Sequence, residues 1–337
     1  MNSNLSKNEQ LIRSGMYRRI KDAFNNSGVY ISDKYIILIA EYFYALNSIS
    51  PESGFFVDIN RAIQVLPQVL KSIKEDRIGV YGITKDNTIT MNSLLSDEAN
   101  KLYFFHELTH AIQTRMKNGH EECSLYNGKT GMFLTEGSTQ FLAEILYNIS
   151  NGGNIKYRQQ PNSVRGLPNH TPYSALSEYQ LNGNIIMMMS YALRLPLNQF
   201  LALGYRSDGR DLLGGLFNAY SKFGGDFEEF MFDLEKIYAI DKLYISGYAD
   251  KMKQEKPSNI ILSPSVQFPG NLKIENNLIN KVERKLINMF IYGNEKEYVM
   301  SKYKEFEKYI TSSELRQYLQ TEVYNRMYEQ QQGYGFA

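Results

Sequence analysis

The chain has 337 residues, 43 % of them hydrophobic, which is enough to fill the core of one large domain or two modest ones. Its 37 lysines and arginines nearly cancel its 36 aspartates and glutamates, so no net field favours nucleic acid or an anionic membrane as a partner. The single cysteine, Cys123, excludes an intramolecular disulfide framework and a multi-cysteine zinc finger, so a metal site here would need histidine and carboxylate ligands.

The first third of the chain predicts helices around a small strand element. Apolar periodicity favours three helices, over 5–24, 33–46 and 58–74. Pro67 should kink the third of them. Residues 88–91 alternate polar with apolar side chains, as a half-buried strand does. Because a turn-like Lys-Asp-Asn sequence precedes them, we expect a hairpin between 77–82 and 87–91.

Two further helices are expected in the middle of the chain. Ser96 is a good N-cap residue. The two acidic residues that follow it would lie at the positive end of the helix dipole, where negative charge is stabilising. Basic residues near its other end and Gly119 indicate that this helix stops there. After a polar loop at 120–131, apolar periodicity predicts a buried helix over 132–147.

The rest of the chain is expected to be a long loop followed by helices. Residues 151–172 are rich in glycine, proline and asparagine, which is typical of a loop. A proline-bearing linker at 257–270 interrupts the helical pattern that follows. The expected helices lie over 177–193, 208–223, 227–251, 275–292, 296–310 and 312–328.

Neither the most apolar stretch of the chain nor its N-terminus indicates a membrane protein. The most apolar stretch, 185–197, carries Arg194 and is shorter than the roughly 20 residues that span a bilayer. We therefore expect no membrane span. The polar N-terminus lacks the apolar core of a secretory signal, so cytoplasmic residence is the default expectation, with export by a route without a signal peptide left open.

A His-Glu-x-x-His sequence lies at 106–110, on the first of the two central helices. Residues four apart on a helix have Cβ atoms about 5–6 Å apart, so His106 and His110 can bind one zinc ion at about 2.0–2.1 Å. Glu107 lies beside the pair, near the position where a water molecule would bind the metal. Zinc lowers the pKa of that water from about 15.7 toward about 7, and Glu107 can then take its proton as it attacks a carbonyl. The predicted reaction is hydrolysis of an amide bond.

A third zinc ligand must come from elsewhere in the chain. The extended metzincin pattern has a glycine and a histidine where this sequence has Gln113 and Met116, so that subclass is excluded. The helix over 132–147 offers two carboxylates, Glu136 at its start and Glu144 eight residues later, near the same face. Spacing alone leaves both open as ligands.

These segments resemble the gluzincins, the zinc peptidase clan of thermolysin and the clostridial neurotoxin light chains. In that clan two helices supply the histidine pair and then a glutamate. The resemblance implies that the zinc ligands are His106, His110 and Glu136. It also implies that Glu107 is the base. Glu136 is favoured over Glu144, because the third ligand of the clan lies at the start of its helix.

The resemblance covers about residues 78–147 and bears on further side chains. Gluzincins often carry an acidic residue, four positions after the ligand glutamate, that orients a ligand histidine. This chain has Gln140 there, which can still hydrogen-bond. The strand at 88–91 would pair with extended substrate, as an edge strand does in zincins. As donors to the oxyanion we favour His170 and Tyr173 in the long loop, which also holds Tyr157, Arg158 and Arg165.

The expected fold is α+β and predominantly helical. Residues 1–150 would form a zincin-like lobe with a small sheet and the active-site helix, 151–256 a helical lobe closing the cleft, and 257–337 a linker and helical C-terminal region. The expected function is that of a zinc-dependent peptidase with Zn²⁺ as cofactor, acting on a peptide or protein. Endopeptidase action is favoured, because no motif would hold a free amine.

Two alternatives to a peptidase stay open. The chain could be a zinc-binding regulator or effector that recognises one specific protein partner with little or no proteolysis. It could also be a helical structural protein in which the motif is accidental, and that alternative predicts no stoichiometric zinc.

Overall fold

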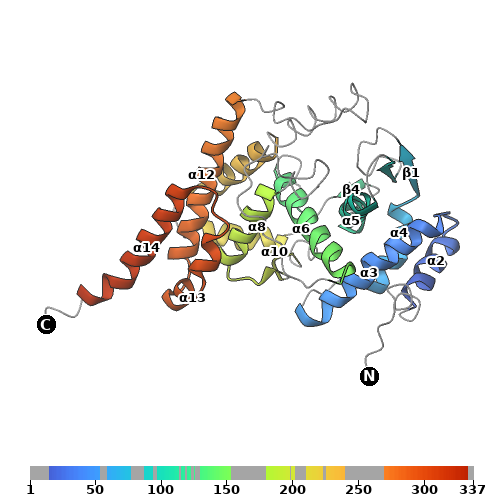
Figure 1. Ribbon diagram of the computed structural model, residues 1–337, viewed down its shortest axis with the longest axis horizontal. Helices are drawn as coiled ribbons and strands as arrows, with labels where there is room; N and C mark the ends of the chain where they lie inside the picture. Colours follow the sequence, from blue (N-terminus) through green and yellow to red (C-terminus); the bar gives the residue numbers. More distant parts are fainter. Residues whose placement is uncertain are drawn as a thin grey trace.

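The computed structural model shows a predominantly helical protein with two small pairs of strands (Figure 1). The N-terminal helices lie at one end of the molecule and the C-terminal helices at the other, with α6 (Met132–Ser150) between them. The expectation of a mostly helical α+β protein is confirmed at this level. The residues that the structure describes are 15–53, 59–76, 87–93, 97–113, 115–117, 120–122, 125, 130–152, 180–197, 199–201, 210–222, 225–239 and 269–332.

Three helices open the described part of the chain. α2 (Met16–Asn26) buries one apolar side chain per turn, which is the pattern that predicted it. α3 (Asp33–Ser53) begins where expected and runs farther, and α4 (Ile59–Val69) carries Pro67 inside it. The third helix ends earlier than predicted, because a strand already begins at Ser72.

The first strand pair differs from the expected hairpin. β1 (Ser72–Asp76) and β2 (Thr88–Asn92) run parallel, with Ser72 opposite Thr88, whereas the expected hairpin partner of β2, at 77–82, lies outside the described residues. Alternation correctly indicated β2, where Ile89 and Met91 are buried. In β1 the only apolar residue is Ile73, so this stretch shows no alternation typical of a strand. Its first residues were therefore predicted as the end of the preceding helix.

A second pair of strands follows the next helix. α5 (Asp97–Gln113) ends before the predicted stop at Gly119. β3 (Arg115–Lys117) and β4 (His120–Glu122) form an antiparallel pair with Lys117 opposite His120, where a helix end and a loop were expected. The sequence between the strands is Asn-Gly, which favours a two-residue hairpin as strongly as a helix end.

The C-terminal half consists of packed helices. The described helices are α8 (Gln180–Ala192), α10 (Arg210–Ser221), a helix over 227–239, α12 (Pro269–Tyr292), α13 (Lys296–Glu307) and α14 (Ser313–Gln332). Each of these helices corresponds to a predicted helix, although α12 begins inside the expected linker. Within the described ranges, no helix is both long and apolar enough to cross a membrane.

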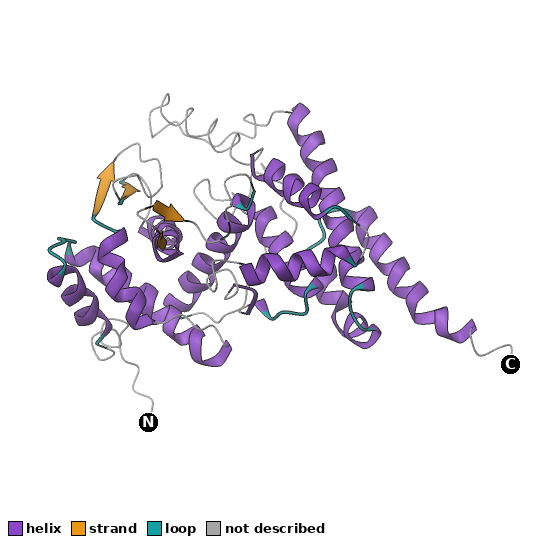
Figure 2. Cartoon of the chain, turned by 180° about the vertical axis from the view of Figure 1, so that it is seen from behind, coloured by secondary structure: helices purple, strands orange, loops and turns teal. Residues whose placement is uncertain are grey.

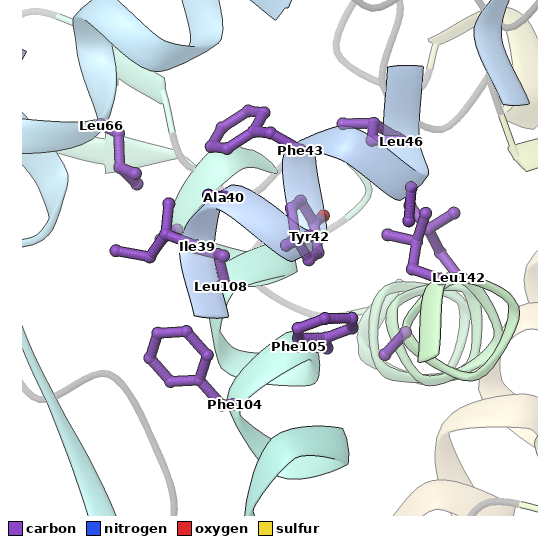
Figure 3. Close-up of a cluster of buried hydrophobic side chains, with 14 of the residues drawn as sticks. Ile39, Ala40, Tyr42, Phe43, Leu46, Leu66, Phe104, Phe105, Leu108 and Leu142 are labelled. Atoms are coloured by element: carbon purple, nitrogen blue, oxygen red, sulfur yellow. The ribbon is translucent and has the colours of Figure 1, made fainter. Parts of the chain in front are cut away.

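Buried apolar side chains form two clusters, and α6 belongs to both. The N-terminal cluster joins α2 to α5 with the later turns of α6, including Phe141 and Leu142. Figure 3 shows part of this cluster, where the side chains of α3 and α5 meet around Tyr42 and Phe105. The C-terminal cluster joins the helices from α8 onward with Phe133 in the first turn of α6. The view from behind shows the same two groups of helices on either side of the centre (Figure 2).

Candidate metal centre

The helix α5 carries the His-Glu-x-x-His sequence and is held by its apolar residues. Phe104, Phe105 and Leu108 are fully buried in the N-terminal cluster. The Tyr42 ring meets the edge of Phe105 at 5.3 Å between centroids, and its hydroxyl lies 2.9 Å from the Thr109 hydroxyl. These contacts pack one side of α5, the helix that carries the two histidines, against α3 (Figure 3).

Three ligand atoms meet where α5 packs against the first turns of α6. His106 Nε2 and His110 Nε2 lie 3.0 Å apart. Glu136 Oε2 lies 3.3 Å from the first nitrogen and 3.2 Å from the second. In the described part of the chain, these are the residues grouped closely enough to hold a metal ion. The structure thus brings together the three side chains chosen from the sequence.

The spacing of the three atoms fits tetrahedral zinc. Bonds of about 2.0–2.1 Å at tetrahedral angles place neighbouring ligand atoms about 3.3 Å apart. The three separations, 3.0, 3.2 and 3.3 Å, are close to this edge length. They are also longer than the roughly 2.7–2.9 Å of a charge-assisted hydrogen bond between nitrogen and carboxylate. The three donor atoms are therefore spaced so that they could hold a metal ion.

Gln140 orients the first histidine. Its side-chain oxygen accepts a hydrogen bond from His106 Nδ1 at 2.8 Å, which leaves the Nε2 lone pair for a metal. Its amide nitrogen donates to Glu144 Oε1 at 3.0 Å. Glu144 therefore lies behind Gln140 rather than beside Glu136, and burial raises its pKa to about 8. Of the two carboxylates left open by spacing, the structure brings only Glu136 to the histidines.

Charges in the site favour an ionised Glu136. Burial alone would raise its pKa, but the nearby charge of His110 and the hydrogen bonds of both imidazoles hold the pKa well below its ordinary value. Burial would lower the pKa of His110, and the charge of Glu136 outweighs it and raises that pKa. An ionised carboxylate and neutral imidazoles are the forms that bind metal, so a cation bound here would replace the imidazole charge that lowers the pKa of Glu136.

Glu107 is buried next to the first ligand. Its side chain is 6 % exposed, and its negative charge also raises the pKa of His110. The carboxylate is near enough to His110 for its charge to act there, and it does not belong to the group of three ligand atoms.

Two residues of the helix over 227–239 bear on the site, and neither was chosen from the sequence. Glu235 Oε1 accepts hydrogen bonds from the backbone nitrogens of Gly131 at 2.7 Å and Phe133 at 3.2 Å. Tyr238 is partly buried, and burial and then the charges of Glu136 and Glu235 raise its pKa. Glu235 lies 104 residues after Gly131 and 102 after Phe133, so no local pattern could have indicated the contact.

The remaining sequence-based choices lie elsewhere. His170 and Tyr173 fall outside the described residues, as does most of the predicted boundary between the first two lobes. No family model matches the chain, and neither the curated proteins nor the solved structures gave a match. Its function must therefore be argued from its own side chains.

Proposed function

We propose that this protein is a zinc-dependent peptidase of the gluzincin type that cleaves within a peptide or protein chain. The observation that carries the proposal is the triangle of His106 Nε2, His110 Nε2 and Glu136 Oε2, with edges of 3.0 to 3.3 Å. Two imidazoles and one carboxylate are the protein ligands of catalytic zinc in thermolysin and carboxypeptidase A, where the fourth position takes water or substrate.

Each residue of the site has a role in this reaction. A zinc ion held by the three ligands would polarise the substrate carbonyl and lower the pKa of a water molecule toward about 7. Glu107 takes a proton from the attacking water and later gives it to the leaving nitrogen. Gln140 keeps the Nδ1 proton of His106 in place, so that the opposite ring nitrogen stays available as a ligand.

Tyr238 is a described side chain that would be able to donate to the oxyanion. A tyrosine phenol is protonated at neutral pH, and burial and then the charge of Glu136 raise the pKa of Tyr238 further. A phenol in that place can donate a hydrogen bond to the oxygen that becomes negative during attack. His170 and Tyr173 stay predictions for the same role. Substrate would pair with β2 at residues 88–91, the strand of the β1–β2 pair that precedes α5.

Metal content and cleavage test the proposal in one set of variants. Wild-type protein should hold about one zinc per chain by elemental analysis, and His106→Ala and Glu136→Gln should lose it. Glu283→Gln is the matched control, because Glu283 is a buried glutamate of α12 that lies outside the ligand group. Its zinc content should equal that of the wild type.

Glu107→Gln separates a peptidase from a zinc-binding regulator. This variant should keep its zinc, while cleavage of a peptide library falls by about 10²-fold or more, the usual contribution of a general base. Zinc without cleavage in the wild type would favour the regulator. A wild type without zinc would overturn both and leave a helical protein with an accidental motif.

A further inference from the structure

The helix that carries Glu136 begins without a cap of its own. Its N-cap residue is Gly131, which has a φ of 112° and no side chain to accept a hydrogen bond. The first turn of α6 also contains no acidic residue. The first four backbone N–H groups of any helix have no partner within the helix. The start of α6 therefore depends on a group from another part of the chain.

Glu235 supplies that group. One of its carboxylate oxygens accepts from Gly131 N at 2.7 Å and from Phe133 N at 3.2 Å. Burial raises the pKa of Glu235, and backbone hydrogen bonds from Gly131, Phe133 and Met132 act against this shift. The interactions with three successive residues show that the carboxylate is centred on the N-terminus of α6, where a negative charge is stabilised by the helix dipole.

The contact bears on the metal site because Glu136 follows within about one turn of helix. Phe133 and Leu134 in the first turn pack into the C-terminal cluster. The histidine ligands come instead from α5, whose apolar residues belong to the N-terminal cluster. The three ligand atoms therefore meet only if the first turn of α6 keeps its position relative to α5, and a shift of well under 1 Å would spoil the tetrahedral spacing.

We infer that Glu235 is a positioning residue for the metal centre, which sets the affinity for zinc by holding the first turn of α6 and with it Glu136. The inference rests on the proposed function, since it takes the three ligands as a zinc site. It assigns the helix over 227–239 to the site, although that helix contributes no ligand.

The test is zinc affinity in the full-length chain, measured by competition with a chelator on metal-stripped protein. Glu235→Ala should bind zinc about tenfold or more weakly, the lower end of the effect seen when groups that orient metal ligands are removed. Glu235→Gln keeps an acceptor oxygen and should recover part of that affinity. If the alanine variant folds poorly, the zinc affinity of this conservative variant still tests the inference.

Asp226→Ala is the matched control. Asp226 Oδ1 accepts from Glu228 N at 2.9 Å and Glu229 N at 3.3 Å, so it caps the same helix over 227–239 without a described contact to α6. Its loss weakens that helix but should leave zinc affinity unchanged. The visible spectrum of the Co²⁺ form, which reports ligand geometry, should likewise change in Glu235→Ala and not in Asp226→Ala.

The outcomes separate this inference from the proposed function. A wild type that binds no zinc would overturn both the proposed peptidase function and the inference. A wild type that binds zinc, with Glu235→Ala equal to it, overturns the inference alone. Equal weakening in Glu235→Ala and Asp226→Ala would also overturn it, because the effect would then be general loosening of the helix rather than the position of Glu136.

Discussion

The side chain that orients His106 is an amide, where gluzincins often have a carboxylate. Gln140 places its oxygen on the imidazole and its nitrogen on Glu144, so the two ends of the amide are distinguished by their partners. A buried carboxylate at this position would place a negative charge next to Glu144, a carboxyl whose own pKa burial raises to about 8. With glutamine, the chain orients the histidine without adding charge to the buried site.

Removal of this amide should weaken metal binding. In Gln140→Ala, the His106 ring loses the acceptor that fixes its Nδ1 proton and its rotation. We expect zinc affinity to fall by about 10- to 100-fold, the range seen when such partners are removed. The measurement is chelator competition on the metal-stripped protein.

Gln113→Ala provides the comparison for that experiment. Gln113 is also a buried amide between α5 and α6, and it accepts a hydrogen bond from Thr139 at 2.8 Å. Its described hydrogen bond is with Thr139 rather than with a histidine ligand. If both variants lost the same affinity, the role of Gln140 would be packing, and the proposed orientation of His106 would be wrong.

At the scale of elements, local patterns predicted more than long-range contacts did. Apolar periodicity located α2, which buries one apolar side chain per turn, and α6, whereas residues typical of helix ends located α5. It missed β1, whose five residues are mostly polar and become a strand only by pairing with β2. It also read Asn118-Gly119 as a helix end, since both helix ends and hairpins use such residues.

The same contrast holds for the residues of the site: local spacing indicated some of them, and only long-range packing indicated the others. Spacing on one helix was enough to select His106 and His110, and it offered Glu136 and Glu144 as the third ligand. Only packing could decide between the two glutamates, because they lie near the same helix face. Glu235 was beyond sequence reasoning altogether, since an acidic residue in an exposed-looking helical pattern is usually a solvated side chain.

A buried glutamate between helices should make stability depend on pH. Glu283 of α12 is fully buried and accepts from Thr311 N, at 3.0 and 3.2 Å, just before α14. Burial raises its pKa from 4.5 to about 7, against hydrogen bonds from Thr311 and the charge of Arg316. The folded state therefore holds a proton that the unfolded state releases between about pH 4.5 and 7.

The sign follows from that proton. Its contribution to stability is complete below about pH 4.5 and is lost as the pH rises through about 7. Glu283→Gln cannot ionise and keeps an acceptor for Thr311 N. The free energy of unfolding of the wild type, relative to this variant, should therefore fall by about 3 kcal/mol between pH 4.5 and 8. Denaturant titrations at several pH values measure it, and a constant or rising difference would contradict the burial argument.

At the scale of the whole molecule, α6 joins two hydrophobic clusters. Its first turn, with Phe133 and Leu134, belongs to the C-terminal cluster, and its later turns, with Phe141 and Leu142, belong to the N-terminal cluster. The candidate metal ligand Glu136 lies between these two sets of contacts. Binding of a metal there would join α5 to the part of α6 that the C-terminal helices hold, so the ion would link both clusters.

The shared helix predicts that the two clusters lose stability together, even without metal. Phe133 is 0 % and Phe141 1 % exposed, so either change to alanine should cost about 3–5 kcal/mol. Because both side chains lie on one continuous helix, the effect should spread to the cluster that was not mutated. With chelator present, hydrogen exchange in mild denaturant should show faster opening of both α3 and α12 in either variant. If Phe133→Ala exposed only α12 and Phe141→Ala only α3, the clusters would be independent units and α6 would not couple them.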